Sequence, residues 1–350
     1  MKLKITLLLL IVSMLTSAQN PFNQSFNSGM QKYRSGDYNG AVNDFSKALN
    51  NRDKARNDYD IADALKRRAL SRMYLGNYNG AIDDIAEAIK LKPEYSELYY
   101  MRSLIHLNNK QYDECIDWAN KGLQLKPHFE ELILLQAKAR YKQKRYTDAL
   151  VFIDTVLVIN PKNTSAWKMK GENKRSMKDY QGGVDAYTKA LEIDAQDVSA
   201  FYGRSYCNAY LKNFDASLVD MNKAMDIDTT ARYVGYNNIG FFIKFEQKDY
   251  KGAIELFNKA LQQNPKYAYS YNNRAYAELQ LNDLKAAHAD VAKSLELDDK
   301  NSYAYKTYAQ ILLAEKKQKQ ACDALQKAIK LGYTEEYDDD VNDMIKQYCK

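Results

Sequence analysis

The chain has 350 residues, a formal net charge of +6 and four cysteines. A charge this mild does not indicate a nucleic-acid partner, and five prolines with fourteen glycines are too few for a β-sandwich or a disordered linker protein. The cysteines form no CxxC pair and stand apart from three single histidines, so we expect no metal site and no cofactor. The one unusual feature of the composition is a total of 29 tyrosines.

The N-terminus has the pattern of a secretory signal peptide. Two lysines precede an apolar run from Ile5 to Leu15, and Thr16-Ser17-Ala18 supplies the small residues of a cleavage site after Ala18. The run is short for a membrane span, and no second apolar run follows it. We therefore expect residues 1–18 to be removed and the mature protein, with a charge of +4, to be periplasmic or secreted from a bacterial cell, with no transmembrane span. An uncleaved N-terminal anchor is the alternative.

The stretch KDYKGAIELFNKALQQNP, from Lys248 to Pro265, recurs along the chain. Close copies follow Gly36 and Gly76, and weaker copies continue at a spacing that is mostly 34 residues. Internal repetition of this length indicates an array of similar structural units. When the tyrosine of the turn is numbered as the seventeenth residue, nine units begin near Phe22, Ala62, Ser96, Glu130, Thr164, Val198, Val234, Ala268 and Ser302.

Three columns of small residues run through the units, at the eighth, twentieth and twenty-seventh positions. In the second unit they are Ala69, Ala81 and Ala88. Small side chains at fixed offsets allow two helices to pack closely, and large apolar residues such as Phe257 fill the seam between them. Each unit is therefore predicted to be a pair of packed helices. Phe241, at the eighth position of the seventh unit, is the exception.

These features resemble the tetratricopeptide repeat, a helix–turn–helix unit of 34 residues, from roughly Phe22 to Gly332. The aromatic residue at the seventeenth position and the proline at the thirty-second, as at Pro93, belong to the same pattern. The resemblance implies an all-α, right-handed superhelical solenoid of nine helix pairs within residues 19–332. Leu284 and Gln318 replace the turn tyrosine, so the last two units are identified by their small residues at the eighth, twentieth and twenty-seventh positions. The expected units are 22–55, 62–95, 96–129, 130–163, 164–197, 198–231, 234–267, 268–301 and 302–335.

Two joints between units are longer than the others. Six extra residues near 56–61 lie in a charged, helix-compatible stretch, where we expect longer helices rather than a loop. Two extra residues near 230–232 predict a local change of superhelix pitch.

The last residues, 333–350, predict a C-terminal capping helix, because a terminal repeat needs a soluble outer face. Asp338 to Asp340 suit a helix start. The expected apolar stripe consists of Val341, Met344, Ile345 and Tyr348. A helix folded back on the preceding one brings Cys349 near Cys322, and in an oxidising compartment we expect a disulfide between them. Two free thiols are the alternative.

No arrangement of residues indicates catalysis. The chain has no phosphate loop, dinucleotide fingerprint, HExxH motif or nucleophile elbow. The paired carboxylates Asp83 and Asp84 are predicted to lie on the solvated outer face of a second helix. Cys115 and Cys207 stand where other units have small residues, so both are expected to be buried packing residues. We therefore predict a protein that is not an enzyme.

The resemblance places the second, fifth, ninth, twelfth and thirteenth positions of each unit on a concave face formed by the first helices. From the sixth unit onwards these positions are rich in aromatic and amide side chains. Aromatic rings supply contact area at low entropic cost, and amides bond an extended peptide backbone. The predicted binding residues are Tyr202, Tyr206, Tyr210, Asn238, Phe242, Phe245, Tyr269, Asn272, Tyr276 and Tyr303. The alternative is that these rings only pack between adjacent helices.

The fourth and fifth units carry basic residues at the same positions. They are Lys138, Lys142, Lys168 and Arg175, with Glu131 and Glu172 among them. A basic patch would receive an acidic tail or an anionic envelope polymer. A solvated, charged face is the alternative. The lysine–asparagine–arginine arrangement with which some members of the family hold a C-terminal carboxylate is absent from these positions.

The sequence therefore predicts a non-enzymatic scaffold that binds an extended peptide, or a segment of a partner protein, in the aromatic groove. One alternative is an envelope glycan or polymer binder that uses the tyrosines as stacking platforms. Another is a structural accessory subunit of a secretion or surface-assembly complex.

Overall fold

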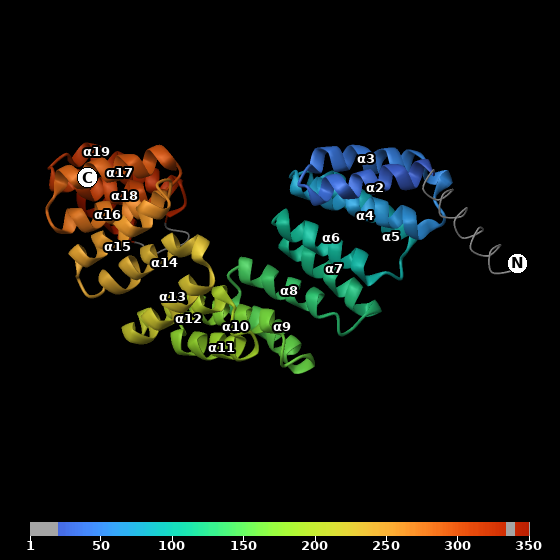
Figure 1. Ribbon diagram of the computed structural model, residues 1–350, viewed down its shortest axis with the longest axis horizontal. Coiled ribbons are helices and arrows are strands. Elements are labelled where there is room, and N and C mark those ends of the chain that lie inside the picture. Colours follow the sequence, from blue (N-terminus) through green and yellow to red (C-terminus); the bar gives the residue numbers. More distant parts are fainter. Residues whose placement is uncertain (1–19, 334–339, 350) are drawn as a thin grey trace, which may run out of the picture. The chain divides into compact units, whose positions relative to one another are not determined.

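The computed structural model describes residues 20–333 and 340–349, so the predicted signal peptide, residues 1–18, lies outside the described residues. All regular structure in this part of the chain is helical, and successive helices pack in pairs, which confirms the predicted fold class (Figure 1). The chain divides into two compact units after Met169, within the fifth helix pair.

The helices of the first unit are α2 (Pro21–Arg34), α3 (Tyr38–Asn50), α4 (Asp58–Tyr74), α5 (Tyr78–Leu91), α6 (Ser96–Asn108), α7 (Tyr112–Leu125), α8 (Glu130–Lys142), α9 (Tyr146–Ile159) and the start of α10 (Thr164–Ser176). The second unit continues with α11 (Tyr180–Ile193), α12 (Val198–Tyr210), α13 (Phe214–Ile227), α14 (Arg232–Asn238), α15 (Tyr250–Gln263), α16 (Ala268–Gln280), α17 (Leu284–Leu297), α18 (Ser302–Ala314), α19 (Gln318–Lys330) and α21 (Asp340–Tyr348).

The columns of small residues line the seam within each helix pair. Ala69, Ala81 and Ala88 are fully buried. At Gly29 a Cβ atom would lie 2.8 Å from the ring of Phe45, so the first helix rests directly on that ring. Small residues recur at the eighth position because a larger side chain there would push the two helices apart.

The turn between the two helices of a pair has a repeated local chemistry. One residue adopts a positive φ, as Gly36 does at +82° and Lys110 at +60°. The next residue often caps the second helix: the carboxylate of Asp37 accepts a hydrogen bond of 2.8 Å from the backbone N–H of Gly40. Capping of this kind satisfies a donor that the first turn of a helix leaves unpaired. The GDYNG sequence of the repeat therefore forms a turn followed by the capped start of the second helix.

A buried ion pair joins the two helices of the second repeat. Arg68 donates hydrogen bonds of 3.0 and 2.6 Å to the carboxylate of Asp84, which also pairs with Arg72 at 2.8 Å. The Asp84 side chain is only 3% exposed, so the prediction of a solvated carboxylate is wrong for Asp84, although Asp83 is exposed. Two guanidinium groups offset the cost of removing this carboxylate from water.

The same clamp, an arginine at the seventh position and an aspartate at the twenty-third, recurs in the second unit. Arg204 donates to Asp220 at 2.8 and 2.7 Å, and its third nitrogen reaches Thr188 of the preceding repeat at 3.1 Å. Arg274 donates to Asp290 at 2.8 Å. Each arginine therefore holds its own repeat together and also fixes the repeat before it.

At the joint between the first two repeats, the prediction of longer helices holds for one of the two helices. Helix α4 has 17 residues against 13 in α6, so one helix is longer, as expected. Helix α3 keeps 13 residues, and a short 3-10 turn at Arg52–Lys54 takes up part of the insertion.

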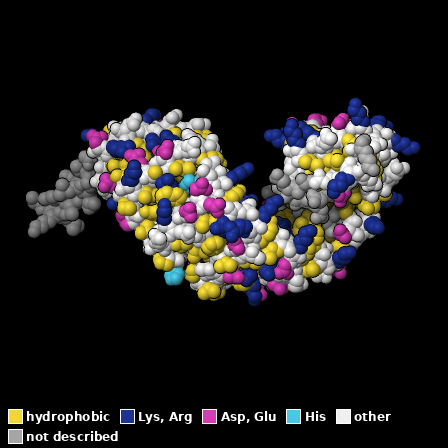
Figure 2. Space-filling view, turned by 180° about the vertical axis from the view of Figure 1, so that it is seen from behind, with side chains coloured by type: hydrophobic (Ala, Val, Ile, Leu, Met, Phe, Trp, Pro, Cys, Tyr) yellow, Lys and Arg dark blue, Asp and Glu magenta, His cyan; other side chains and the backbone are white. Residues whose placement is uncertain are grey.

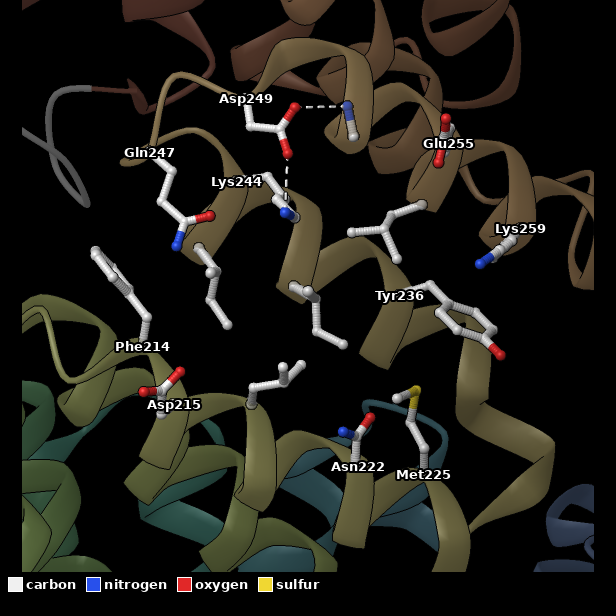
Figure 3. A pocket seen from close by; sticks show the side chains of 15 residues that line it. Phe214, Asp215, Asn222, Met225, Tyr236, Lys244, Gln247, Asp249, Glu255 and Lys259 are labelled. Atoms are coloured by element: carbon white, nitrogen blue, oxygen red, sulfur yellow. Dashed lines mark hydrogen bonds and ion pairs between the residues drawn. The ribbon is translucent and has the colours of Figure 1, made fainter.

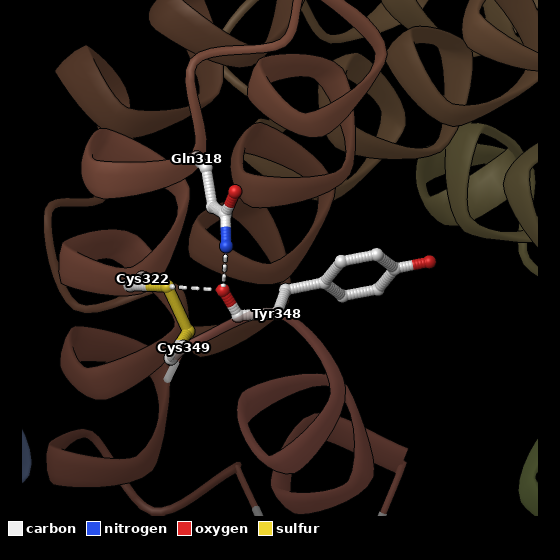
Figure 4. Close-up of a disulfide and its surroundings, with 4 residues drawn as sticks. All are labelled: Gln318, Cys322, Tyr348 and Cys349. Carbon is white, nitrogen blue, oxygen red and sulfur yellow. Dashed lines mark hydrogen bonds between the residues drawn. A yellow bond between two sulfur atoms is a disulfide. The ribbon is translucent and has the colours of Figure 1, made fainter.

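Helix α21 packs against the ninth repeat. Val341 is fully buried, and Met344 and Ile345 contact the same apolar cluster as Leu312 and Leu325. Tyr348 is not part of that cluster; instead its backbone carbonyl accepts a hydrogen bond from the Gln318 side chain (Figure 4).

The cysteines fall into two classes. A disulfide joins Cys322 to Cys349, with the Cα atoms 5.6 Å apart (Figure 4). Cys115 and Cys207 are buried, unpaired thiols, and burial raises their pKa values to about 12 and about 11, so neither is a reactive thiolate at neutral pH.

Replacing Arg204 with methionine should destabilise the second unit by about 3 kcal/mol, because Asp220 is left buried without its partner. Denaturant unfolding followed by circular dichroism would measure this. The double variant Arg204→Met/Asp220→Leu should regain most of the loss. A single variant as stable as the double one would show that the clamp contributes nothing.

Reduction of the Cys322–Cys349 disulfide should loosen α21, since the bond closes a loop with a sequence separation of 27 residues. Such a loop corresponds to about 3 kcal/mol of stabilisation. Hydrogen exchange of the α21 amides should accelerate after reduction, whereas exchange in α2 and α3 should not change. A Cys322→Ala/Cys349→Ala variant should be insensitive to reductant. Equal α21 exchange in oxidised and reduced protein would contradict the prediction.

Candidate partner-binding surface

The first helix of the seventh repeat is irregular. A 3-10 turn at Thr229–Ala231 leads into α14, which continues as a π-helix over Ile239–Lys244. The two inserted residues of this joint are divided between these features. One lies before Gly240, and the other is absorbed by the wider turns of the π-helix.

This irregularity corrects the sequence alignment of the seventh repeat. Gly240, not Phe241, occupies the small eighth position: a Cβ atom on Gly240 would lie 2.7 Å from the buried Phe257 ring. Phe241 is turned outwards and is 38% exposed. The preceding residues shift by one position as well, so Asn237 takes the fifth position to which the sequence alignment assigned Asn238. Asn237 is buried, whereas Asn238 is half-buried.

Five rings from α12 and the π-helix region form one cluster, which we call the aromatic patch: Tyr206, Tyr210, Phe241, Phe242 and Phe245. Tyr206 stacks on Tyr210 and meets Phe242 edge to face, both with ring centroids 4.7 Å apart. Phe241 contacts Phe242 at 4.9 Å and Phe245 at 5.6 Å. Tyr210, 47% exposed, and Phe241 are the open rings of the patch.

The patch carries a positive charge at one edge. The guanidinium of Arg175 lies 4.7 Å from the ring centroid of Tyr206, a cation–π contact. Burial raises the pKa of Tyr206 well above its ordinary value, so this hydroxyl stays neutral at physiological pH. The structure therefore brings the predicted Arg175 together with the predicted Tyr206, Tyr210, Phe242 and Phe245.

Other predicted residues have a packing role. Tyr202 lies against the buried cluster of Met221 and Ile243, and Tyr276 packs on Phe245 at 5.2 Å. Asn272 is only 5% exposed, and its Oδ1 atom is buried without a hydrogen-bond partner. These three side chains therefore contribute to packing, and a binding role for them remains a prediction.

A second row of rings follows the later repeats. Tyr269, 43% exposed, lies 6.4 Å from Tyr303, which meets Tyr333 at 5.5 Å. Lys306, at the fifth position of the ninth repeat, bonds the Tyr333 hydroxyl at 2.9 Å and pairs with Asp340. Tyr333 and Asp340 thus contact Lys306 on the first helix of the last repeat.

The remaining predicted basic residues lie in the first unit. Lys138 and Lys142 are exposed on α8, and Lys168 is half-exposed on α10. Figure 2 shows Lys and Arg side chains interspersed with Asp and Glu over the face in view. A binding role for this basic set remains a prediction.

Sequence reasoning missed an aromatic cluster in the first unit. The rings of Tyr38 and Tyr74 stack with centroids 4.6 Å apart and 12° between planes, Tyr33 joins them, and Tyr74 is 54% exposed. Tyr180 and Tyr210 stack in the same way at 4.7 Å. The signal was present: a tyrosine at the seventeenth position of one repeat and another at the thirteenth of the next.

Within residues 20–333 and 340–349, no three acidic, histidine or cysteine side chains gather as a metal site would require. In the same residues, no helix combines the length and apolarity needed to span a bilayer.

The register of the π-helix can be tested by two substitutions. Gly240→Ala should cost about 1–3 kcal/mol, because the methyl group meets the fully buried Phe257 ring. Phe241→Ser should cost less than Gly240→Ala, since the ring is turned outwards and loses only its contacts with Phe242 and Phe245. Thermal unfolding would measure both. The opposite ranking would show that Phe241 occupies the seam.

Comparisons with known proteins agree with this architecture. Sequence profiles described as tetratricopeptide repeat match residues 66–128 and 244–311. The small glutamine-rich tetratricopeptide repeat-containing protein 2 of Mycosarcoma maydis is 30% identical over 89 residues. That match covers 25% of this chain and only 25% of the relative.

Among solved structures, a tetratricopeptide repeat protein from Parabacteroides merdae ATCC 43184 superimposes with a TM-score of 0.54 at 16% identity, covering 83% of this chain and 99% of that one. MamA from Desulfovibrio magneticus RS-1 matches with a TM-score of 0.43 at 18% identity, over 49% of this chain and 97% of its own. With the paired helices, the small-residue seams and both profile matches, the chain is a tetratricopeptide repeat protein.

Proposed function

We propose that this protein is a non-enzymatic scaffold that binds an extended segment of a partner protein on the aromatic patch. Tetratricopeptide repeats generally mediate protein–protein interaction, and the patch is the surface of the second unit best suited to it. The observation that carries the proposal is the outward rotation of Phe241, which leaves a large apolar ring 38% exposed beside the 47% exposed Tyr210.

The patch is organised before any partner arrives. Its five rings already pack against one another, so binding would immobilise few side chains and lose little conformational entropy. Arg175 fixes Tyr206 from one side, and Tyr180 fixes Tyr210 from another. The apolar or aromatic side chains of a partner segment would pack on these rigid rings. The tyrosine hydroxyls would form hydrogen bonds with the backbone of that segment.

We also propose that the protein works outside the cytoplasm. Two features support this: the charged, apolar and small-residue pattern of residues 1–18, and a disulfide between Cys322 and Cys349. Disulfides persist mainly in oxidising compartments. N-terminal sequencing of the protein purified from its native cell should begin at Gln19, and an intact Met1 would contradict export by this route.

The binding proposal can be tested by photo-crosslinking in the native cell. With p-benzoylphenylalanine at position 210, we expect crosslinks to one protein, and mass spectrometry should place them in one short segment of it. The same probe at Val219, which is 59% exposed on α13, is the matched control. Adding Phe241→Ser should reduce the yield from position 210 about tenfold if this ring is a binding hot spot.

Several outcomes would contradict the proposal. Crosslinks of equal yield from positions 210 and 219, or crosslinks that persist after Phe241→Ser, would show that the patch is not the binding surface. Binding to insoluble envelope polymer without any protein, lost on the same substitution, would instead assign the tyrosines to a glycan.

A further inference from the structure

A second surface lies on another side of the seventh repeat. An open cleft of about 450 Å³ runs between α13 and α15 (Figure 3). Met225, Ile239 and Ile243 form its deep wall and are buried, whereas Leu218 at its edge is 39% exposed. None of the five rings of the aromatic patch lines this cleft.

The cleft exists because of the two inserted residues. The 3-10 turn at Thr229–Ala231 lengthens the connection from α13, and the π-helix then changes the direction of the side chains that follow. As a result the side chains of Tyr236, Ile239 and Ile243 line the space between two second helices. One irregular segment thus turns Phe241 outwards and also provides the wall of this cleft.

The rims of the cleft are polar, and both carry a carboxylate. Asp215 lies on the α13 rim and Glu255 on the α15 rim (Figure 3). Both are exposed, and neither takes part in an ion pair among the described residues. The basic groups differ: Lys244 is paired with Asp249 at 2.8 Å, which leaves Lys259 as the unpaired cation of the lining.

We propose that this cleft binds an amphipathic helix of a protein partner, with an apolar stripe facing Leu218 and Leu256 and basic residues flanking that stripe. A groove bounded by two helices, with an apolar floor and polar rims, is the surface on which an amphipathic helix docks. The unpaired carboxylates on both rims complement basic side chains on both sides of such a helix.

The shape of the cleft favours a helix over a small apolar molecule. The cleft is open to solvent rather than enclosed, so it would leave much of a small molecule in water. The chain as a whole carries a charge of +6, so attraction of a basic helix must come from these local carboxylates.

The proposal can be tested with a defined probe. We would use a synthetic 14-residue peptide, acetylated and amidated, with leucines at helical spacing flanked by lysines, and a control peptide in which glutamates replace the lysines. Fluorescence anisotropy with the full mature chain should detect binding of the lysine peptide and not of the glutamate peptide. Higher salt should weaken the binding, since exposed charges are screened.

Matched variants locate the binding site. Leu218→Asp should weaken binding at least tenfold, which is about 1.4 kcal/mol or more, and Asp215→Lys about threefold to tenfold, which is about 0.7–1.4 kcal/mol. Val219→Asp lies on the same helix but outside the cleft lining, and should leave binding unchanged. All three side chains are exposed, so the variants should fold, which circular dichroism would verify.

The outcomes separate this cleft from the aromatic patch. Phe241→Ser should not affect the lysine peptide, and Leu218→Asp should not affect crosslinking from position 210. Equal binding of the two peptides, or equal effects of Leu218→Asp and Val219→Asp, would overturn the proposal. Loss of binding on Phe241→Ser alone would assign the peptide to the aromatic patch.

Discussion

The structure depends on how closely two helices can approach within each repeat. Where the eighth position is glycine, the first helix rests on a ring of the second, as Gly29 does on Phe45 and Gly171 on Tyr187. In both cases a Cβ atom added to the glycine would lie only 2.8 Å from the nearest atom of that ring. Interiors are packed to near crystal density, so no larger side chain fits there. This contact sets the spacing of a pair, and the pair is the unit from which both halves of the chain are built.

Apolar clusters continue from one pair into the next, and polar contacts also join successive pairs. The arginine–aspartate clamp joins Arg204 to Asp220 within a repeat and reaches Thr188 in the repeat before. A buried ion pair of this kind contributes modest net stability, because desolvation of both charges opposes their attraction. Its geometry is demanding, however, since a planar guanidinium needs two acceptors in fixed places. We suggest that it specifies the stacking of repeats, whereas the apolar seam supplies the free energy.

The seventh repeat shows how a small insertion creates new surface. Two additional residues cannot be accommodated in a regular helix pair without moving every seam residue out of register. The chain keeps Gly240 under Phe257 and absorbs the difference in a 3-10 turn and a π-helix. The consequences are an exposed Phe241 on one side and an open cleft between α13 and α15 on another. π-helical turns are often found at functional sites for this reason.

The sequence by itself determined the fold class and the helix pairs, because a repeat with small residues at three fixed positions is compatible with few other structures. It also indicated four of the five rings of the aromatic patch, all except Phe241, and the pairing of Cys322 with Cys349. Only the tertiary structure decided which of two neighbours, Gly240 or Phe241, faces the seam, since that depends on where the backbone absorbs an extra residue. It likewise decided that Asp84 is buried, because its partner Arg68 lies 16 residues away on another helix and compensates the charge only after the two helices have packed.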